Sequence, residues 1–307
     1  MLYDLHTHSY CSDGQLSPAE LVTLARRQGV TVLALTDHDT LDGIAEAQQA
    51  ALEPFDAVAN EVLDDAMENT TSEDTTSEDT NTNNYKPLTI ITGIELSTQW
   101  RGRGIHIIGL NIDIDSPVLK AAIHAQTQTR IQRAETIAQR LEKAGVKDAL
   151  AGAKRHAGGG AIGRPHFAQY MVDSGYVSTI PQAFKRYLGA GKVGDVKQCW
   201  PDIDEAVKWI VQAGGIAVLA HPDKYDLTRT KLYELLGDFS EAGGRGMEVV
   251  SGHQDKSVTL KLARAADDFS LLASCGSDFH SPKNTWQAVG RYSPLPESCT
   301  PVWTQFT

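Results

Sequence analysis

Short, apolar, β-branched segments alternate along the chain with segments of helical period, and this alternation limits the fold more than any other feature. A capping box with proline at the first helical position, Ser17 to Glu20, opens one helix, and Gly29 ends it. We expect strands at residues 1–6, 30–39, 87–95, 105–112, 215–222, 246–250 and 270–280, and helices at 17–28, 42–53, 202–213, 228–237 and 255–268. Strand–helix alternation on this scale predicts a parallel sheet, closed or open.

Metal-binding side chains follow or end most of these strands. In parallel α/β architectures the carboxyl ends of the strands meet at one rim, where active sites lie. The side chains expected on this rim are those of His6, His8, Asp13, His38, Glu95, His106, His221, Asp278 and His280. Asp37 and Asp39, which flank His38, are expected to orient ligands or to cap helices.

The chemistry of this set points to divalent metal ions. His6 and His8 are two residues apart on a strand, so both point to the same side, as two ligands of one ion must. Imidazole suits zinc, manganese or iron, and carboxylate suits manganese or magnesium. Nine ligands are too many for one ion and indicate a cluster of two or three, which can activate water for an in-line displacement at phosphorus.

The motifs DLHTH (4–8), TDHD (36–39), GIE (93–95), AHP (220–222) and SDFH (277–280), in this order, resemble the PHP (polymerase and histidinol phosphatase) family. The resemblance covers roughly residues 1–115 and 195–290. It implies a distorted (β/α)7 TIM-like barrel that holds up to three divalent ions, with Mn²⁺ expected first and Fe²⁺, Zn²⁺ or Mg²⁺ as alternatives. The ligand sets that it implies are His6, His8, Glu95 and Asp278 for the first ion, Asp13, His38 and His280 for the second, and Glu95, His106 and His221 for the third.

Two segments interrupt the barrel pattern. Residues 58–86 contain the repeat TTSEDTTSEDT and few apolar residues, so we expect a disordered acidic surface insertion. Residues 117–195 are polar and helical, and we expect a mostly helical inserted lid between a first barrel part, 1–116, and a second, 196–307. Nine acidic residues and no basic residue lie between positions 56 and 84, so most of the net charge of −11 belongs to that stretch. The body is near neutral, which does not support a broad basic surface for duplex nucleic acid.

A narrower resemblance concerns the helical insertion. The spacing of eleven between Glu95 and His106, with GRPH at 163–166 and YLGAGK at 187–192, is similar to the branch that removes the 3′-phosphate of nucleoside 3′,5′-bisphosphates and trims RNA from its 5′ end. The resemblance implies that Arg164 and His166 clamp a phosphate and take part in catalysis, with Lys192 as a further substrate-binding residue. Alternatively, Arg164 and His166 cap and pin the following helix.

The expected function is therefore that of a metal-dependent phosphoesterase. A hydroxide bridging two ions would attack phosphorus, Arg164 would neutralise the developing charge, and inorganic phosphate would be released. His253 or a metal-bound water is the candidate acid for the leaving group. The expected substrate is a phosphorylated nucleotide or a short RNA 5′ end. The alternatives are a histidinol-phosphatase-like enzyme and a non-catalytic metal-binding regulatory module; a C–N hydrolase is disfavoured because no lysine is expected at a comparable strand end.

The sequence contains few signals that bear on the cellular location of the protein. No charged start followed by an apolar stretch indicates a signal peptide, and no apolar run approaches the roughly 18–20 residues of a membrane span. The four cysteines are scattered without a CxxC pair, which favours free thiols in a reducing compartment. We expect a cytoplasmic protein that does not bind membranes.

Overall fold

A computed structural model of the chain describes residues 1–54, 87–196 and 199–306. The acidic insertion expected at 58–86 lies outside the described residues. No helix in the described ranges is long and apolar enough to cross a bilayer.

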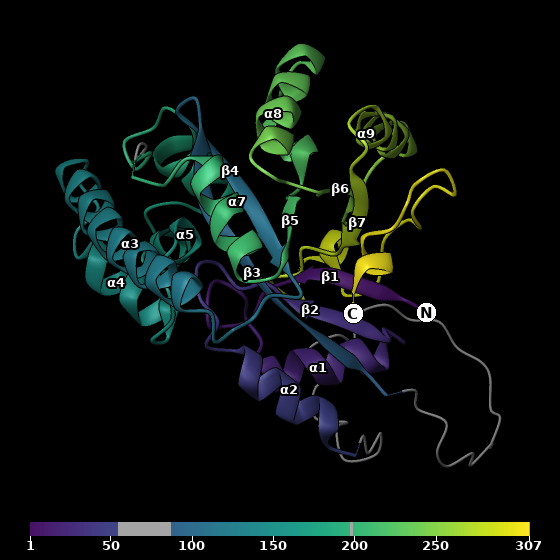
Figure 1. The fold of residues 1–307 in the computed structure, drawn as a ribbon. Helices are drawn as coiled ribbons and strands as arrows, with labels where there is room; N and C mark the ends of the chain where they lie inside the picture. The colour runs from purple at the N-terminus through teal and green to yellow at the C-terminus, as the bar shows by residue number, and fades with distance from the viewer. Residues whose placement is uncertain (55–86, 197–198, 307) are drawn as a thin grey trace.

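Seven strands form one sheet in sequential order, β1 to β7. Their bounds are Tyr3–Thr7 (β1), Val32–Leu35 (β2), Thr89–Trp100 (β3), Arg103–Leu110 (β4), Ile216–Leu219 (β5), Gly246–Ser251 (β6) and Leu272–Gly276 (β7). The sheet curves until its first and last strands meet, so the expected distorted seven-stranded barrel is confirmed (Figure 1).

The contact between β1 and β7 closes the barrel next to the histidines of the first strand. The amide of Asp278 donates to the carbonyl of His6 at 2.8 Å, and the amide of His8 donates to the carbonyl of Phe279 at 2.9 Å. A Cβ atom at Gly276 would lie 2.5 Å from His6 Cβ and 2.6 Å from His6 N, so only glycine permits this close approach.

The expectation of a parallel sheet is wrong at one strand. β4 runs antiparallel to both β3 and β5, whereas the other neighbouring pairs are parallel. A two-residue turn connects β3 to β4: Trp100 pairs with Arg103, and Arg101 and Gly102 adopt φ values of 50° and 75°. So short a connection makes a hairpin, because a parallel pair needs a crossover of a dozen or more residues. His106 therefore lies within an antiparallel strand, opposite Ser97.

Helices cover the outside of the barrel (Figure 1). Those that pack near β1 and β2 are α1 (Pro18–Arg27) and α2 (Ile44–Leu52), and those that follow β4, β5 and β6 on the other side are α7 (Ile203–Gln212), α8 (Arg229–Glu241) and α9 (Lys256–Asp268). The predicted capping box of α1 is present: Glu20 N donates to Ser17 Oγ at 3.1 Å, and Ser17 N donates to Glu20 Oε2 at 2.7 Å. Short 3₁₀ helices span Pro222–Tyr225, Thr285–Gln287 and Val302–Gln305.

The segment between β4 and α7 is helical and has an apolar core of its own. It contains α3 (Pro117–Lys143), α4 (Ala149–Ala157), α5 (Arg164–Asp173), α6 (Ile180–Ala183) and a π-helical turn, Phe184–Leu188. Leu141, Phe167, Met171 and Leu188 are fully buried in this core. In Figure 1 these helices stand at one flank of the barrel, so they can wall one side of a site at the carboxyl ends of the strands.

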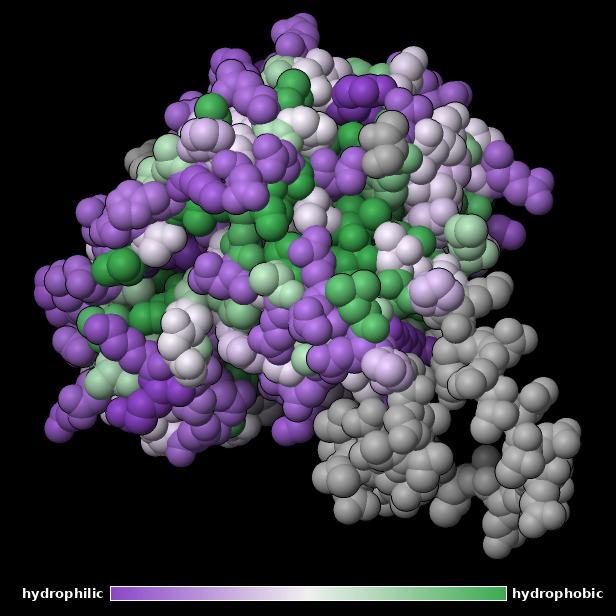
Figure 2. Space-filling view, turned by 60° about the horizontal axis from the view of Figure 1, so that its bottom comes forward, coloured by the Kyte–Doolittle hydropathy of each residue, from purple (hydrophilic) through white to green (hydrophobic). Residues whose placement is uncertain are grey.

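The outer surface carries mainly hydrophilic residues on the face drawn in Figure 2, with apolar residues in separate places between them. The two described ends of the chain lie near one another in Figure 1, and the rings of Tyr3 and Trp303 stack at 4.1 Å between centroids. The C-terminal segment thus packs beside β1 and places Val302 in an apolar cluster to which five neighbouring strands, β1 to β5, contribute, away from the side of the barrel where the α3–α5 helices stand.

Candidate metal centre

The structure brings all nine of the side chains expected on the rim into one cluster. His6 comes from β1, Glu95 from β3 and His106 from β4; the other six follow β1, β2, β5 or β7 in the chain. Glu95 lies at the middle of the cluster. Its carboxylate oxygens are 2.9–3.3 Å from a ring nitrogen of each of five histidines: His6, His8, His38, His106 and His221.

The neighbouring histidines determine the charge of Glu95. Burial alone would raise the pKa of the Glu95 carboxyl, but the nearby His38, His6 and His106 hold it well below its usual range. The side chain is 1% exposed. Glu95 is thus a buried carboxylate whose two oxygens face nitrogen donors on several sides, the arrangement that a bridging metal ligand requires.

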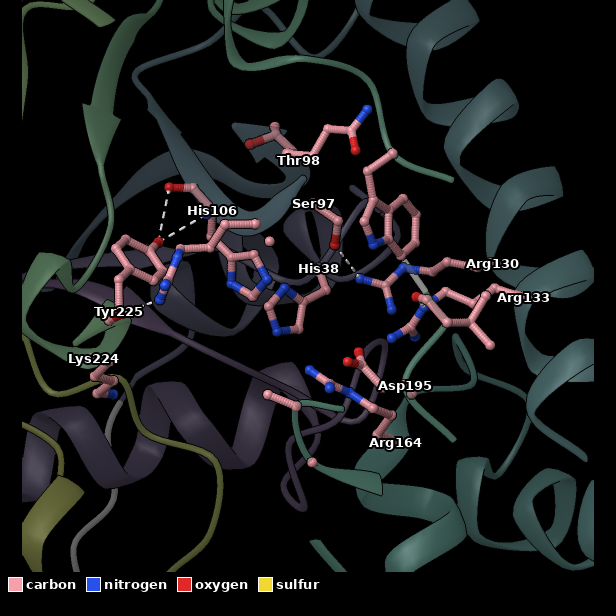
Figure 3. A pocket seen from close by; sticks show the side chains of 18 of the residues that line it. His38, Ser97, Thr98, His106, Arg130, Arg133, Arg164, Asp195, Lys224 and Tyr225 are labelled. Carbon is pink, nitrogen blue, oxygen red and sulfur yellow. Dashed lines mark hydrogen bonds between the residues drawn. The ribbon is translucent and has the colours of Figure 1, made fainter. Parts of the chain in front are cut away.

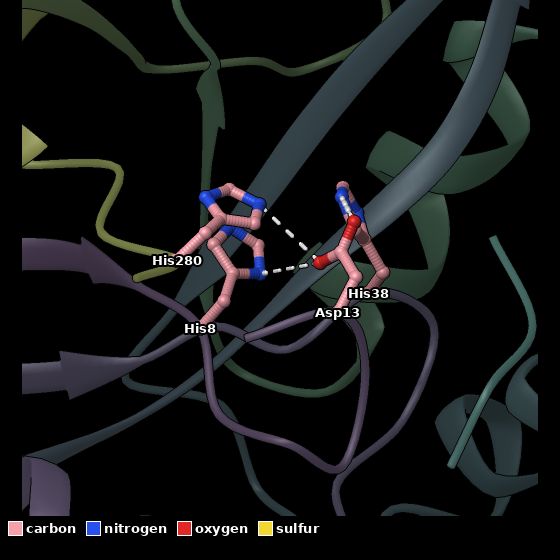
Figure 4. Close-up of side chains that lie close together, drawn as sticks. All are labelled: His8, Asp13, His38 and His280. Carbon is pink, nitrogen blue, oxygen red and sulfur yellow. Dashed lines mark ion pairs between the residues drawn. The ribbon is translucent and has the colours of Figure 1, made fainter. Parts of the chain in front are cut away.

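Asp13 organises a second part of the cluster (Figure 4). Its carboxylate lies between His38 on one side and His8 and His280 on the other. The distances to the nearest ring nitrogens are 3.3 Å for His280, 3.8 Å for His38 and 3.9 Å for His8. These spacings leave room for a cation among the four groups.

The donor atoms fit divalent ions. Four groups of three or four donors, each within 4.8 Å of one another, are formed by His8, Asp13, His38 and His280; by His6, Glu95 and His221; by His6, His8 and Asp278; and by His38, Glu95 and His106. Nε2 of His6 lies 3.0 Å from Nε2 of His8, so two ring nitrogens converge on one point. Nδ1 of His38 is buried and forms no hydrogen bond, although Glu95 Oε2 is 3.0 Å away. Nitrogen atoms placed in this way are better arranged to coordinate a shared metal ion than to hydrogen-bond to one another.

Several residues outside the cluster hold its members in position. Glu248 is fully buried: its Oε1 lies 3.0 Å from His6 Nδ1, and its Oε2 accepts the amide of His221 at 2.6 Å. Asp37 accepts from the amide and hydroxyl of Ser9 and from the hydroxyl of Ser12, which fixes the loop between His8 and Asp13. Such partners fix the orientation of metal ligands.

The position of Glu248 leads to a prediction. We expect Glu248→Gln to weaken metal affinity by about 10- to 100-fold, because the amide cannot accept from both His6 and His221 as the carboxylate does. Calorimetric titration with the metal ion measures the effect. Glu205→Gln, at an exposed position of α7, is the matched control. Unchanged affinity in Glu248→Gln would show that Glu248 does not orient the ligands.

The backbone is strained at the centre. His221, Asp278 and Asp39 adopt φ values of 26°, 53° and 54°, in the left-handed region that side chains other than glycine rarely occupy. Each such residue costs of order 1–3 kcal/mol, and such strain gathers at functional sites. The strain therefore favours a functional role for these turns. Two of the three strained residues, His221 and Asp278, are themselves proposed metal ligands.

A cavity of about 750 Å³ opens beside the cluster (Figure 3). Asp13, His38, His106 and His221 form part of its floor. In Figure 3, His38 and His106 lie between two groups of cationic and polar side chains: Arg130, Arg133 and Arg164 on one side, and Lys224 and Tyr225 on the other. The cavity is therefore positively charged on both sides of the metal centre.

Two of these arginines, Arg133 and Arg164, have the carboxylate of Asp195 as a nearby counter-charge, so two guanidinium groups face one carboxylate on this side of the cavity (Figure 3). Burial and the neighbouring guanidinium of Arg164 lower the pKa of Arg133 to about 10, and burial lowers the pKa of Arg164. Arg164 Nη1 donates to the carbonyl of Leu188 at 3.2 Å, and Arg133 Nε donates to that of Val196 at 3.3 Å. Arg130 differs, because it pairs with buried Asp39 at 2.6 Å. The first two guanidinium groups favour an anion in the cavity.

The other candidate substrate-binding residues, His166 and Lys192, and the candidate acid His253 do not line the cavity. His166 is buried and does not line the cavity; its Nδ1 accepts the amide of Gly163 at 3.0 Å, the capping role that was the alternative. Lys192 is exposed and outside the cavity lining. His253 is exposed and lines a separate small pocket of about 100 Å³ beyond His221 and Lys224.

Lys224 was missed by the sequence analysis. It lies in the 3₁₀ helix three residues after His221, lines the cavity and forms an ion pair with Asp278. The expectation that no lysine stands near a strand end is therefore wrong. Its signal was present in the sequence as HPDKY, directly after β5.

Comparisons with known proteins agree with this geometry. The model of the PHP domain family matches residues 4–110. The chain is 44% identical over 304 residues to the 5′-3′ exoribonuclease of Haemophilus influenzae, covering 99% of this chain and 98% of that protein. It is 38% identical over 303 residues to the 3′,5′-nucleoside bisphosphate phosphatase of Chromobacterium violaceum, covering 98% and 95%. A solved structure from C. violaceum, described as an amidohydrolase with bound sulfate and no metal, superposes with a TM-score of 0.84 at 37% identity over 100% of this chain and 96% of that one.

Proposed function

Because the chain belongs to the PHP domain family and is a metal-dependent phosphoric ester hydrolase, we propose that it removes the 3′-phosphate of nucleoside 3′,5′-bisphosphates and trims short RNA from its 5′ end. One observation carries the proposal most strongly: a cluster of six histidines and three carboxylates lies in one cavity beside two arginines, the buried Arg133 and the half-buried Arg164, which outnumber their shared carboxylate neighbour Asp195. The cluster suits the phosphate that reacts, and the arginines suit a second phosphate of the same substrate. A nucleoside 3′,5′-bisphosphate has both.

The two activities need the same bond to break. Water adds across the bond between phosphorus and the 3′-oxygen, so its oxygen stays on phosphorus and its proton ends on the 3′-oxygen. In a bisphosphate the products are a nucleoside 5′-phosphate and inorganic phosphate. In RNA they are a nucleoside 5′-phosphate and a shortened strand that keeps a 5′-phosphate and is itself a substrate.

The nine clustered residues would hold the metal ions, and we propose manganese in a centre of two or three ions. When bound, such ions polarise the phosphoryl group and lower the pKa of water. The side chains themselves set the geometry: Glu95 and Asp13 each face several histidines, and Glu248 and Asp37 fix the segments that bear His6 and His8.

Arg133 and Arg164 would hold the 5′-phosphate, and residues 117–195 would serve as the side wall or lid that bears both arginines. His166 keeps a supporting role in this proposal by capping α5, which positions Arg164 at the first turn of that helix. The proposed setting is the cytoplasm, in keeping with four cysteines that form no disulfide.

The experiment that tests the proposal is phosphate release by the manganese-loaded protein. The substrates are adenosine 3′,5′-bisphosphate, histidinol phosphate and a 5′-phosphorylated RNA oligomer. We expect rapid release from the bisphosphate and stepwise 5′ trimming of the RNA. Activity on histidinol phosphate alone would assign the protein to the histidinol phosphatase branch, and no turnover with metals still bound would indicate a non-catalytic module.

The role of Arg164 is testable by changing either the residue or the substrate. We expect Arg164→Gln to lower kcat/KM for adenosine 3′,5′-bisphosphate by about 10- to 100-fold, since a hydrogen bond to a charged group is worth about 1.5–3 kcal/mol. Adenosine 3′-monophosphate lacks the 5′-phosphate, so its kcat/KM should change little. Equal losses on both substrates would place Arg164 on the reacting phosphate instead.

A further inference from the structure

The cavity has a second wall that carries cationic side chains. In Figure 3, Tyr225 and Lys224 lie on the opposite side of His38 and His106 from Arg133 and Arg164. The tip of the β3–β4 hairpin, residues 101–104 with the sequence RGRG, lines the cavity on this side. If the 5′-phosphate lies at Arg133 and Arg164 and the reacting phosphate lies at the metals, this wall faces the part of the substrate on the 3′ side of the reacting phosphate.

The hairpin tip is held firmly in place. Trp100 Nε1 donates to Asp238 Oδ2 of α8 at 2.7 Å, and Arg101 pairs with Glu234 and Asp238 of the same helix. The positive φ values of Arg101 and Gly102 match a two-residue hairpin turn that fits the twist of the flanking strands. The guanidinium groups of the tip thus start from a fixed backbone and need no rearrangement of the hairpin to meet a ligand.

Arg103 differs from Arg101 in its partners. Arg103 is exposed, and its Nη1 donates to the backbone carbonyl of Tyr225 at 2.5 Å. Within the ranges that the structure describes, Arg103 forms no ion pair with a carboxylate, whereas Arg101 has two. A guanidinium group has five N–H donors, so most of those of Arg103 remain for an anion.

The position of Arg103 suits a phosphate next to the one that reacts. Tyr225 joins Arg103 to the metal centre, because the amide of His106 donates to the Tyr225 hydroxyl at 2.8 Å. Arg103 and His106 are three residues apart on β4, which corresponds to roughly 10 Å along the strand. This is a distance that the next one or two nucleotides of a single strand can reach, and one that a bisphosphate cannot extend into.

We infer that Arg103 is a specificity residue that binds the RNA backbone beyond the reacting phosphate, so that it serves the trimming of RNA and not the hydrolysis of a mononucleotide. The inference rests on the proposed function. It divides the cavity into two halves: Arg133 and Arg164 recognise the 5′ end, and Arg103 recognises the strand that is left behind.

The test compares the manganese-loaded wild-type chain with Arg103→Gln on adenosine 3′,5′-bisphosphate and on a 5′-phosphorylated RNA hexamer. We expect kcat/KM for the hexamer to fall about tenfold, the value of one charged contact, and that for the bisphosphate to stay within about twofold. The salt dependence gives a second readout. Each phosphate contact to a single strand adds about 0.7 to the slope of log affinity against log salt, so Arg103→Gln should flatten the slope for RNA by about that amount. Arg103→Lys, which keeps the charge, should restore part of the loss.

Arg245→Gln is the matched control, because Arg245 is exposed and immediately precedes β6, at the opposite end of the barrel from the metal centre. Equal losses on both substrates, or no loss on either, would overturn the inference. Wild-type activity on the bisphosphate with none on RNA would overturn it as well while leaving the phosphatase proposal intact. A wild-type chain inactive on both substrates would overturn the proposed function and this inference with it.

Discussion

Glu95→Gln is expected to reduce phosphatase activity by about 10³-fold or more. Glu95 is buried and contacts five histidines, so neutralising it removes the one negative charge that the ring nitrogens share. Breaking a buried charge pair costs about 3–5 kcal/mol, which corresponds to a factor of roughly 10² to 10⁴. Asp278, 3.5 Å from His6 and from His8, and Asp13, 3.8 Å from His38, lie farther from the histidines that they share with Glu95, so we do not expect either to replace it. Initial rates on adenosine 3′,5′-bisphosphate at saturating Mn²⁺ measure the effect.

The control for this substitution is Glu205→Gln, which removes the same charge at an exposed position of α7 and should keep full activity. Circular dichroism and thermal melting separate a lost centre from a lost fold. If a folded Glu95→Gln variant kept activity within tenfold of the wild type, Glu95 would not bridge metal ions in the way proposed.

Removal of divalent ions is expected to have the second-largest effect. After treatment with a chelator, activity should fall to background, and added Mn²⁺ should restore it. The chain should also lose stability, because ions that bind the folded state alone stabilise it by about 4 kcal/mol per site at a concentration of 10³ times Kd. For a chain of this length that corresponds to a drop in Tm of roughly 6 °C for each such ion.

The direction of this stability change follows from the side chains. Without cations, Glu95 and Asp13 are compensated by histidines that are themselves costly to charge in a buried site, and Asp278 by such histidines together with Lys224. Thermal melting with and without chelator measures the change. A chain whose Tm and activity are both unchanged by complete metal removal would contradict a metal centre at this position.

The sequence predicted the composition of the centre well because its chemistry is local. His6, His8, His38 and His280 stand within or directly after strands, and a strand end can be recognised from an apolar run and the residues that stop it. The convergence of these strand ends then follows from the architecture, without knowledge of any single contact. Glu95 and His106 were found by the same reasoning, although β4 runs antiparallel.

The predictions that failed depended on contacts between distant segments. The direction of β4 is decided by the two-residue turn at Arg101 and Gly102, whose sequence RGRG was not interpreted as a hairpin. Glu248 contacts His6 and His221, and Lys224 contacts Asp278, across 27 or more residues of sequence. The segment HPDKY places Lys224 near His221, but no local pattern identifies the distant partners of Glu248 and Lys224. Arg133 stands within a long polar helix where its sequence neighbours give no sign that it faces a cavity.

The most direct test of the metal centre is the anomalous scattering of a crystal grown with Mn²⁺ and measured near the manganese absorption edge. We predict two or three anomalous peaks, each inside one of the donor groups built around Glu95 and Asp13. Peaks confined to other parts of the molecule, or none within reach of these two carboxylates in an active preparation, would contradict the account.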